Sequence, residues 1–474
     1  MTEDYTPPTI SNELGRSAEA AIDRNFISRG ISLQPLSDID GVAIPSLINK
    51  FGSPLFVFSE HSLRSQARHA LQAFRSRYQD THFGWSYKTN YLSAICQILH
   101  SEGWDAEVVS DFEYQKAKKL GISGSDIIYN GPYKPEASLK TALEEGALVQ
   151  IDNWDELSLI EQLTSQQEKT VRVGIRIWLD AGIRPVWSKF GFSLSNGEAA
   201  RAAIHVINNP KLQLESLHTH IGTYILEPNA YRVATQKLVA LREQLELQQN
   251  YLVPCLNLGG GVPSQSLLHG MMGPAKQVVP PIESYAEAIT GVLAGLPANK
   301  QPMLRLELGR YLVDEAGYLL TSVTALKGSS RPAPIETDQT GQSAKEWLIL
   351  QEEARRSLVI DAGINLLYTA AWFQIDALPT RVINTPLEPT RLYGPLCMAI
   401  DSVREQVDLP QLEVGDTLAL HPVGAYNLGQ SMQFIEFRPA AILICEDGTP
   451  EVIRRRECLE DVDGPERLPP HLEK

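Results

Sequence analysis

HFGWSYK, residues 82–88, is a short apolar run that ends in a lysine, and it opens a series of similar runs. The others are WDAEVVS at 104, DIIYNG at 126, ALVQID at 147, VRVGIRIWL at 171, LESLHTHIG at 214, CLNLGGG at 255 and MLRLELGR at 303. Stretches with helical apolar spacing lie between them. A parallel sheet needs crossover helices and closes readily at eight strands, so this alternation predicts a (β/α)8 barrel over residues 59–313. An open doubly wound sheet is the alternative.

The alternation of strand-like and helix-like segments ends at about residue 313. Short strand-like segments with turn residues follow, at 318–328, 346–351, 357–363, 380–385, 416–424 and 436–445, and they predict a C-terminal β-domain over residues 314–455. We expect residues 41–58 to be a strand segment that joins this β-domain. Residues 1–40 are interpreted as an N-terminal extension, 329–346 as an exposed hairpin loop and 456–474 as a charged tail.

Composition excludes several classes of protein. The chain has 474 residues, 43% hydrophobic and 21% charged, with a formal net charge of -15, which argues against nucleic acid or an anionic membrane as a partner. The five cysteines are widely spaced without a CxxC pair, so neither a disulfide framework nor a metal site is expected. No signal sequence or long apolar run is found, and a cytoplasmic location is expected.

Residues that could take part in binding or catalysis lie where the strand patterns end. In a barrel of this kind, the active site is formed at the carboxyl ends of the strands. Lys88 ends the first run, and a desolvated lysine is a candidate Schiff-base nucleophile. Gly259, Gly260 and Gly261 offer backbone N–H groups that suit a phosphate. His220 could stack on a flat ring, and Glu307 with Arg310 supplies an acid and a cation. Together these groups predict pyridoxal 5′-phosphate as the cofactor.

A series of short motifs in this chain is similar to the motifs of a known family. They are SPLFVFS, SYKTN, DAEVVSDFE, YNGPYK, IDNWDEL, SKFGF, LHTHIG, LNLGGG, ELGR, DAGIN, GPLCMAID and VGAY, spread over roughly residues 40–445. The chain resembles the fold-type III pyridoxal-phosphate decarboxylases, the group of diaminopimelate and ornithine decarboxylases. The resemblance implies a barrel like that of alanine racemase with a C-terminal β-sandwich.

The resemblance also implies roles for individual residues. Lys88 would bind the cofactor covalently, His220 would stack on its ring, and Glu307 would pair with the ring nitrogen. The phosphate side would comprise Thr223, the three glycines 259–261, Gly309, Arg310 and Tyr426. Cys397 would return a proton to Cα, entering the partner subunit's site together with Asp401, so a homodimer with shared sites is expected.

The substrate half departs from the family pattern. Where diaminopimelate decarboxylases carry Arg, Tyr and Glu, this chain has Thr369, Phe373 and Met398, and Arg310 and Asp401 complete the expected substrate set. We therefore predict a decarboxylase of an L-amino acid or amino acid conjugate in siderophore or other specialised biosynthesis. The alternatives are meso-diaminopimelate decarboxylation in lysine biosynthesis, an amino-acid racemase on the same fold, and a non-catalytic homologue that binds a partner.

Overall fold

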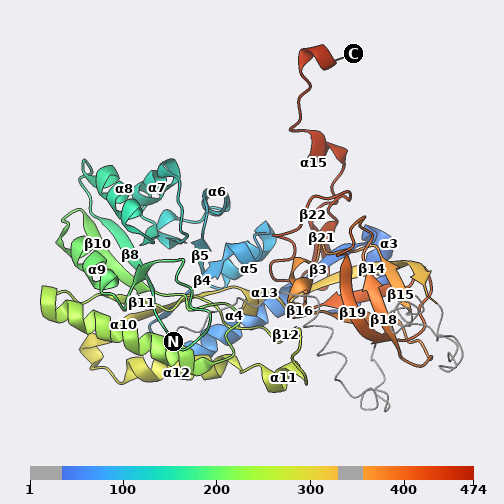
Figure 1. Ribbon diagram of the computed structural model, residues 1–474, viewed down its shortest axis with the longest axis horizontal. Helices are drawn as coiled ribbons and strands as arrows, with labels where there is room; N and C mark the ends of the chain where they lie inside the picture. Colours follow the sequence, from blue (N-terminus) through green and yellow to red (C-terminus); the bar gives the residue numbers. More distant parts are fainter. Residues whose placement is uncertain (1–34, 329–355, 474) are drawn as a thin grey trace, which may run out of the picture.

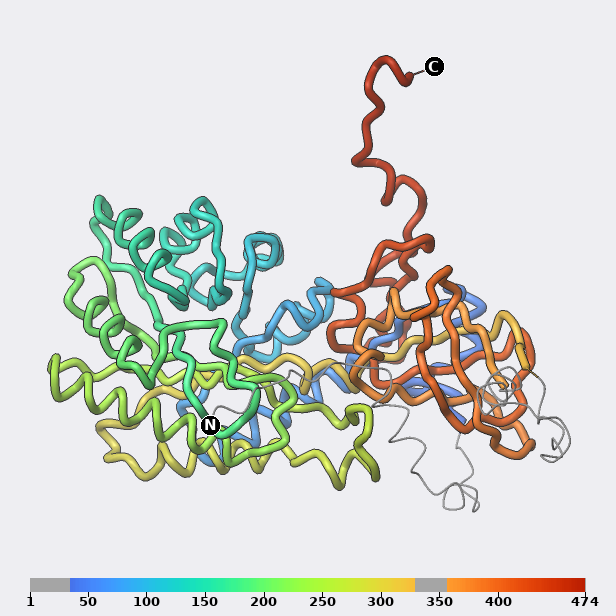
Figure 2. Tube along the Cα trace, in the orientation of Figure 1, coloured from blue at the N-terminus to red at the C-terminus, as the bar shows by residue number. Residues whose placement is uncertain are grey.

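The computed structural model describes residues 35–328 and 356–473. A barrel surrounded by helices lies on one side and a β-domain on the other (Figures 1 and 2). Within these described ranges, none of the helices has the length and apolar character needed to cross a membrane.

The predicted barrel is confirmed. Its strands are β4 (Thr81–Ser86), β5 (Asp105–Val108), β6 (Ile127–Tyr129), β7 (Leu148–Ile151), β8 (Val171–Trp178), β10 (Leu212–His218), β11 (Cys255–Asn257) and β13 (Met303–Leu308). All pair in parallel with their neighbours, and the pairing of β10 with β8 closes the ring. The open-sheet alternative is therefore wrong. Because the strands are parallel, their carboxyl ends meet at one mouth.

Helices cover the outside of the barrel. They are α4 (Glu60–Arg75), α5 (Ser93–Ser101), α6 (Asp111–Lys119), α7 (Glu136–Glu144), α8 (Trp154–Thr164), α9 (Glu198–Asn208), α10 (Pro228–Gln249) and α12 (Ile282–Ala294). Several begin with a side-chain cap: Ser110 accepts a hydrogen bond from the N–H of Glu113, and Asn153 accepts one from the N–H of Glu156. Such caps satisfy the free N–H groups at a helix start and fix the preceding loops at the barrel mouth.

The β-domain is organised around β14 (Gly317–Lys327). This strand pairs with β15 (Ser357–Ile360), with β20 (Thr417–His421) and with β3 (Leu55–Ser59). The remaining strands are β17 (Asp376–Pro379), β18 (Glu388–Tyr393), β19 (Ser402–Leu409), β21 (Ala440–Ile444) and β22 (Pro450–Arg454). In Figure 1 the blue β3 lies among the orange and red strands, so the chain enters this sheet before it builds the barrel.

Two strand predictions in this domain need comment. Residues 380–385 form no strand but connect β17 to β18. The N–H of Thr380 still donates to the carbonyl of Thr417 in β20, and the segment leaves the sheet after it. The predicted strand at 346–351 and the predicted hairpin loop at 329–346 lie outside the described residues, as do residues 1–34. Within residues 35–54, β1 (Asp38–Ile39) pairs with β2 (Val42–Ala43) and α3 (Ile44–Phe51) follows, so paired structure begins ahead of residue 41.

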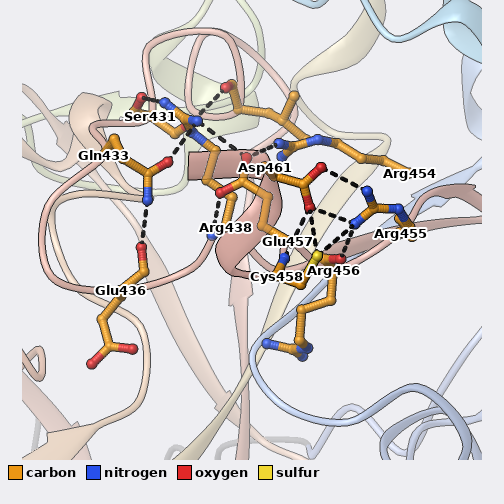
Figure 3. Close-up of polar contacts among 11 residues, drawn as sticks. Ser431, Gln433, Glu436, Arg438, Arg454, Arg455, Arg456, Glu457, Cys458 and Asp461 are labelled. Carbon is orange, nitrogen blue, oxygen red and sulfur yellow. Dashed lines mark hydrogen bonds and ion pairs between the residues drawn. The ribbon is translucent and has the colours of Figure 1, made fainter. Parts of the chain in front are cut away.

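The C-terminal segment projects away from the rest of the chain (Figure 1). It carries α15 (Leu459–Asp463), and Figure 3 shows the ion pairs at its base. Glu457 binds Arg438 and Arg454, and Asp461 binds Arg455 while accepting the N–H of Cys458. These contacts connect the segment to the loop before β21.

Candidate active site

A cavity of about 680 Å³ lies where the barrel mouth faces the β-domain. The barrel strands contribute one wall through polar side chains and glycines. The β-domain contributes the other through Tyr368, Thr369, Trp372, Phe373, Tyr426 and Gln430. The cavity thus contains most of the residues that the sequence places at strand ends.

Lys88 follows β4 and opens into this cavity. Its side chain is 38% exposed there, and its Nζ lies 2.5 Å from Oε2 of the buried Glu107. Burial alone would lower the pKa of Lys88, but the negative charges of Glu107 and its neighbours outweigh it, so the pKa lies above the usual value. The amine is therefore charged and held at one oxygen of Glu107.

Glu307 at the end of β13 is a buried carboxylate that remains ionised. Burial favours its neutral form, but His218, at 3.2 Å from Oε2, and Lys88 outweigh this and hold the pKa of Glu307 well below its usual value. Two amides add hydrogen bonds: Asn130 Nδ2 donates to Oε2 at 3.0 Å and Asn257 Nδ2 to Oε1 at 2.7 Å. A fixed negative charge in a low-dielectric site is suited to keeping a bound ring nitrogen protonated.

A continuous chain of hydrogen bonds joins these groups. The Nδ2 of Asn130 also donates to Oε1 of Glu107, at 2.9 Å, so one amide lies between the two buried carboxylates. At the far end, Asn257 Oδ1 accepts the N–H of Gly259 at 2.9 Å. The chain of contacts therefore runs from Lys88 through Glu107, Asn130, Glu307 and Asn257 to the glycine turn.

The glycine turn at 259–261 approaches its neighbours too closely for side chains. A Cβ on Gly260 would come within 2.2 Å of the carbonyl oxygen of Glu307, and Gly259 and Gly261 have φ values of 62° and 101°. The N–H of Gly259 is bound to Asn257, and the N–H of Gly260 donates to Nδ1 of His220 at 3.0 Å. The expectation of three consecutive free N–H groups is thus corrected, because side chains bind two of them.

His220 lies beside this turn and faces the cavity. Burial, with the charges of Arg176 and Lys88, lowers the pKa of His220 well below its usual value. The ring is therefore neutral, with Nδ1 as acceptor, and it can stack on a flat ligand. Trp187 lies beside it, with 5.2 Å between ring centroids. Thr223, on the same loop, lines the cavity but is exposed.

Arg310 lies between the two halves of the site. Its Nη1 donates to Asp314 at 2.9 Å, and its guanidinium stacks on Phe373 and Tyr426, at 4.0 and 5.2 Å from the ring centroids. Its buried Nε has no hydrogen-bond partner in the described part of the chain. Gly309 precedes it, and a Cβ there would meet Thr89. Arg310 can therefore receive an anionic group from the cavity.

The β-domain wall beyond Arg310 is largely aromatic. Thr369 is buried and its hydroxyl is bound to Asn427, at 2.9 Å, so it offers little to a ligand. Phe373 contacts Arg310 and packs edge-on against Tyr224. Tyr368 and Trp372, with rings 5.1 Å apart, line the same side.

The predicted residues on the loop 394–401 lie outside this cavity. Cys397 is exposed and Met398 is half-buried. Asp401 is buried, and its two oxygens accept the N–H groups of Leu396 at 2.7 Å and Ile364 at 2.9 Å. Within its own chain, the carboxylate of Asp401 holds the loop against the segment 361–365, and its contact with a substrate in a partner's site stays a prediction.

The residues present fit pyridoxal phosphate. An accessible amine, a neutral imidazole, a buried ionised acid and a glycine turn with no room for Cβ atoms surround one cavity. Asn130 Oδ1 and His218 Nδ1 are buried polar atoms without hydrogen-bond partners among the described residues. A polar ring cofactor suits such a site better than an apolar ligand would.

Comparison with known proteins supports the same cofactor. The family described as "Pyridoxal-dependent decarboxylase, pyridoxal binding domain" matches residues 62–314. The diaminopimelate decarboxylase of Methanocaldococcus jannaschii is 27% identical over 453 residues, covering 92% of this chain and 95% of its own. That of Aquifex aeolicus is 25% identical and covers 88% and 93%. The crystal structure of the M. jannaschii enzyme with L-lysine has a TM-score of 0.79 and 26% identity, covering 94% and 99%.

The chain belongs to the pyridoxal-dependent decarboxylases. It is a pyridoxal-phosphate-dependent carboxy-lyase, as its relatives of nearly full length are.

Two polar residues of the site, Glu107 and Asn257, were missing from the residues that the sequence selects, whereas Asn130 and His218 stand at the ends of apolar runs and are selected there. Glu107 lies inside β5 and Asn257 is the last residue of β11, and each is followed by an apolar residue, Val108 and Leu258. Attention to the ends of the apolar runs therefore selects Ser110 and Glu113 instead. A signal was available in the sequence: a charged or amide side chain inside a buried apolar run needs a partner.

One prediction from the site concerns the buried Glu113, whose protonation should make the free energy of unfolding depend on pH. Burial raises the pKa of Glu113 from 4.5 to about 7, and Lys88 opposes this only in part. The folded state therefore binds more protons than the unfolded chain between these values, so the free energy of unfolding falls as pH rises through this window. Glu113→Gln keeps an acceptor for the N–H of Val109 and should lose this slope, gaining up to about 3 kcal/mol over the wild type above pH 7.

Urea unfolding of the cofactor-free protein from pH 4 to 8 measures this difference. The exposed Glu144→Gln serves as the control and should leave the pH dependence unchanged. Parallel stability curves for wild type and Glu113→Gln would show that Glu113 is not the source.

Proposed function

We propose that this carboxy-lyase removes the α-carboxylate of meso-diaminopimelate. The observation that carries the proposal is similarity to diaminopimelate decarboxylases over 88–92% of the chain. The sequence analysis placed this activity second, and the relatives support it better than a role in siderophore or other specialised biosynthesis. Arg310, which lines the cavity and whose Nε has no hydrogen-bond partner among the described residues, offers one site for a second carboxylate.

The barrel residues would divide the cofactor's chemistry among them. Bound pyridoxal phosphate supplies an electron sink for the electron pair released when CO₂ leaves. Lys88 would bind its aldehyde, and Glu307, fixed as a carboxylate, would hold the proton on the ring nitrogen. His220 would pack on the ring face, while Gly261, Arg310, Thr223 and Tyr426 would receive the phosphate or the substrate carboxylate.

A second candidate substrate follows from the aromatic wall. Phe373, Trp372 and Tyr368 line the distal side, and the hydroxyl of Thr369 is bound to Asn427. Leaving a charged distal group without partners costs several kcal/mol, on the order of the penalty for a buried unpaired ion. This wall therefore favours an amino acid whose distal end is larger or less charged, such as an acylated diamino acid.

The first prediction concerns the covalent anchor. Borohydride reduction of the loaded enzyme followed by peptide mapping should place the pyridoxyl group on Lys88, and Lys88→Ala should bind no cofactor covalently and lose essentially all turnover. The matched control is Lys140→Met, because Lys140 is exposed and lies outside the cavity. A label on any other lysine would overturn the assignment.

The second prediction separates the two substrates. If the proposal holds, kcat/KM for meso-diaminopimelate should exceed that for Nε-acylated diamino acids by tenfold or more, and Arg310→Gln should reduce this preference. CO₂ release in a competition between the two measures the ratio. The opposite ranking would assign the chain to a conjugate substrate and refute meso-diaminopimelate.

We further propose a homodimer in which the loop 394–401 of one copy completes the site of the other. The position of Cys397 supports this proposal, because the residue is exposed and lies outside the cavity of its own chain. A role for its thiol in returning a proton to Cα therefore requires a second copy.

Mixing two inactive variants tests this arrangement. Lys88→Ala and Cys397→Ala should each be inactive, but subunit exchange creates mixed dimers in which one site has both intact residues. About a quarter of wild-type activity at most is expected from random exchange, since half the dimers are mixed and each has one intact site. Activity that stays at the level of the separate variants would contradict shared sites.

A further inference from the structure

Asn257 connects two parts of the site that bind different ends of the cofactor. It is fully buried on β11, and its backbone pairs with His218 of β10 on one side and Arg305 of β13 on the other. Its Nδ2 donates to Oε1 of Glu307 at 2.7 Å, and its Oδ1 accepts the N–H of Gly259 at 2.9 Å.

The orientation of this amide is determined by its partners. A carboxylate requires a donor and a backbone N–H requires an acceptor, so rotating the amide by 180° would break both contacts. The backbone of Glu307 is also bound to the turn, because its N–H donates to the carbonyl of Gly259 at 2.8 Å. The acid and the turn are therefore positioned together rather than separately.

From these contacts we propose that Asn257 is a positioning residue that couples the ring-nitrogen acid Glu307 to the glycine turn on the phosphate side. Asn130 provides the comparison. It also donates to Glu307, at 3.0 Å, but its other partner is Glu107 and it has no contact with the turn. Loss of Asn257 should weaken the binding of the phosphate, whereas loss of Asn130 should not.

The test compares the binding of pyridoxal phosphate and pyridoxal to the full chain freed of cofactor. The ratio of the two dissociation constants measures the contribution of the phosphate, and fluorescence quenching measures both constants. Asn257→Leu should lower this ratio about tenfold, the effect of one lost buried hydrogen bond. Asn130→Leu should leave the ratio within about twofold of wild type.

An unchanged ratio in Asn257→Leu would overturn the proposal, and so would an equal loss in Asn130→Leu. Thermal unfolding of each cofactor-free variant checks that it is folded. Should Asn257→Leu not fold, Asn257→Ser replaces it, because a serine hydroxyl is too short to reach both partners. The measurement involves no amino acid substrate, so it stands or falls independently of the activity on meso-diaminopimelate.

Discussion

The ionised carboxylate of Glu307, buried at the base of the cavity, is the constraint on which the rest of the site depends. Removing a carboxylate from water favours its protonated form, and a protonated acid could not keep a ring nitrogen charged. His218, Asn130 and Asn257 reverse this preference by placing donors or positive charge around it. These three side chains come from different strands or strand ends, so only a closed barrel in the correct register brings them together.

The barrel could be predicted because its strands are short, apolar and separated by helices of regular period. Each strand is buried on both faces, which gives a continuous apolar run that is visible in the sequence. The β-domain was harder, because its central strand β14 pairs with β3, more than 250 residues earlier, and with β15 and β20 later in the chain. Residues 380–385 have a strand-like composition but pair with no strand in the described part of the chain, and local pattern cannot reveal that.

The candidate site also contains residues that the sequence could predict and residues that it could not. Lys88, His220, the glycines and Glu307 stand at or next to the ends of strands, and a barrel places such positions at one mouth. Glu107 and Asn257 lie within the strands and face inward, so their roles depend on which residues lie opposite them across the barrel. The same holds for Asp401: its neighbours Ile364 and Leu396 are determined by the fold of two loops, and its carboxylate accepts an N–H group from each.

The two halves of the site are built from separate parts of the chain, which allows one to change while the other persists. Every member of the hydrogen-bond chain from Lys88 to Gly259 belongs to the barrel, whereas the aromatic wall belongs to the segment 368–373 of the β-domain. Substitutions in that wall therefore leave the buried carboxylates undisturbed. Arg310 is the exception, since it stacks on Phe373 while bound to Asp314. A change at Phe373 alters the packing of this guanidinium, so the shape of the aromatic wall and the position of the Arg310 cation are linked at that contact.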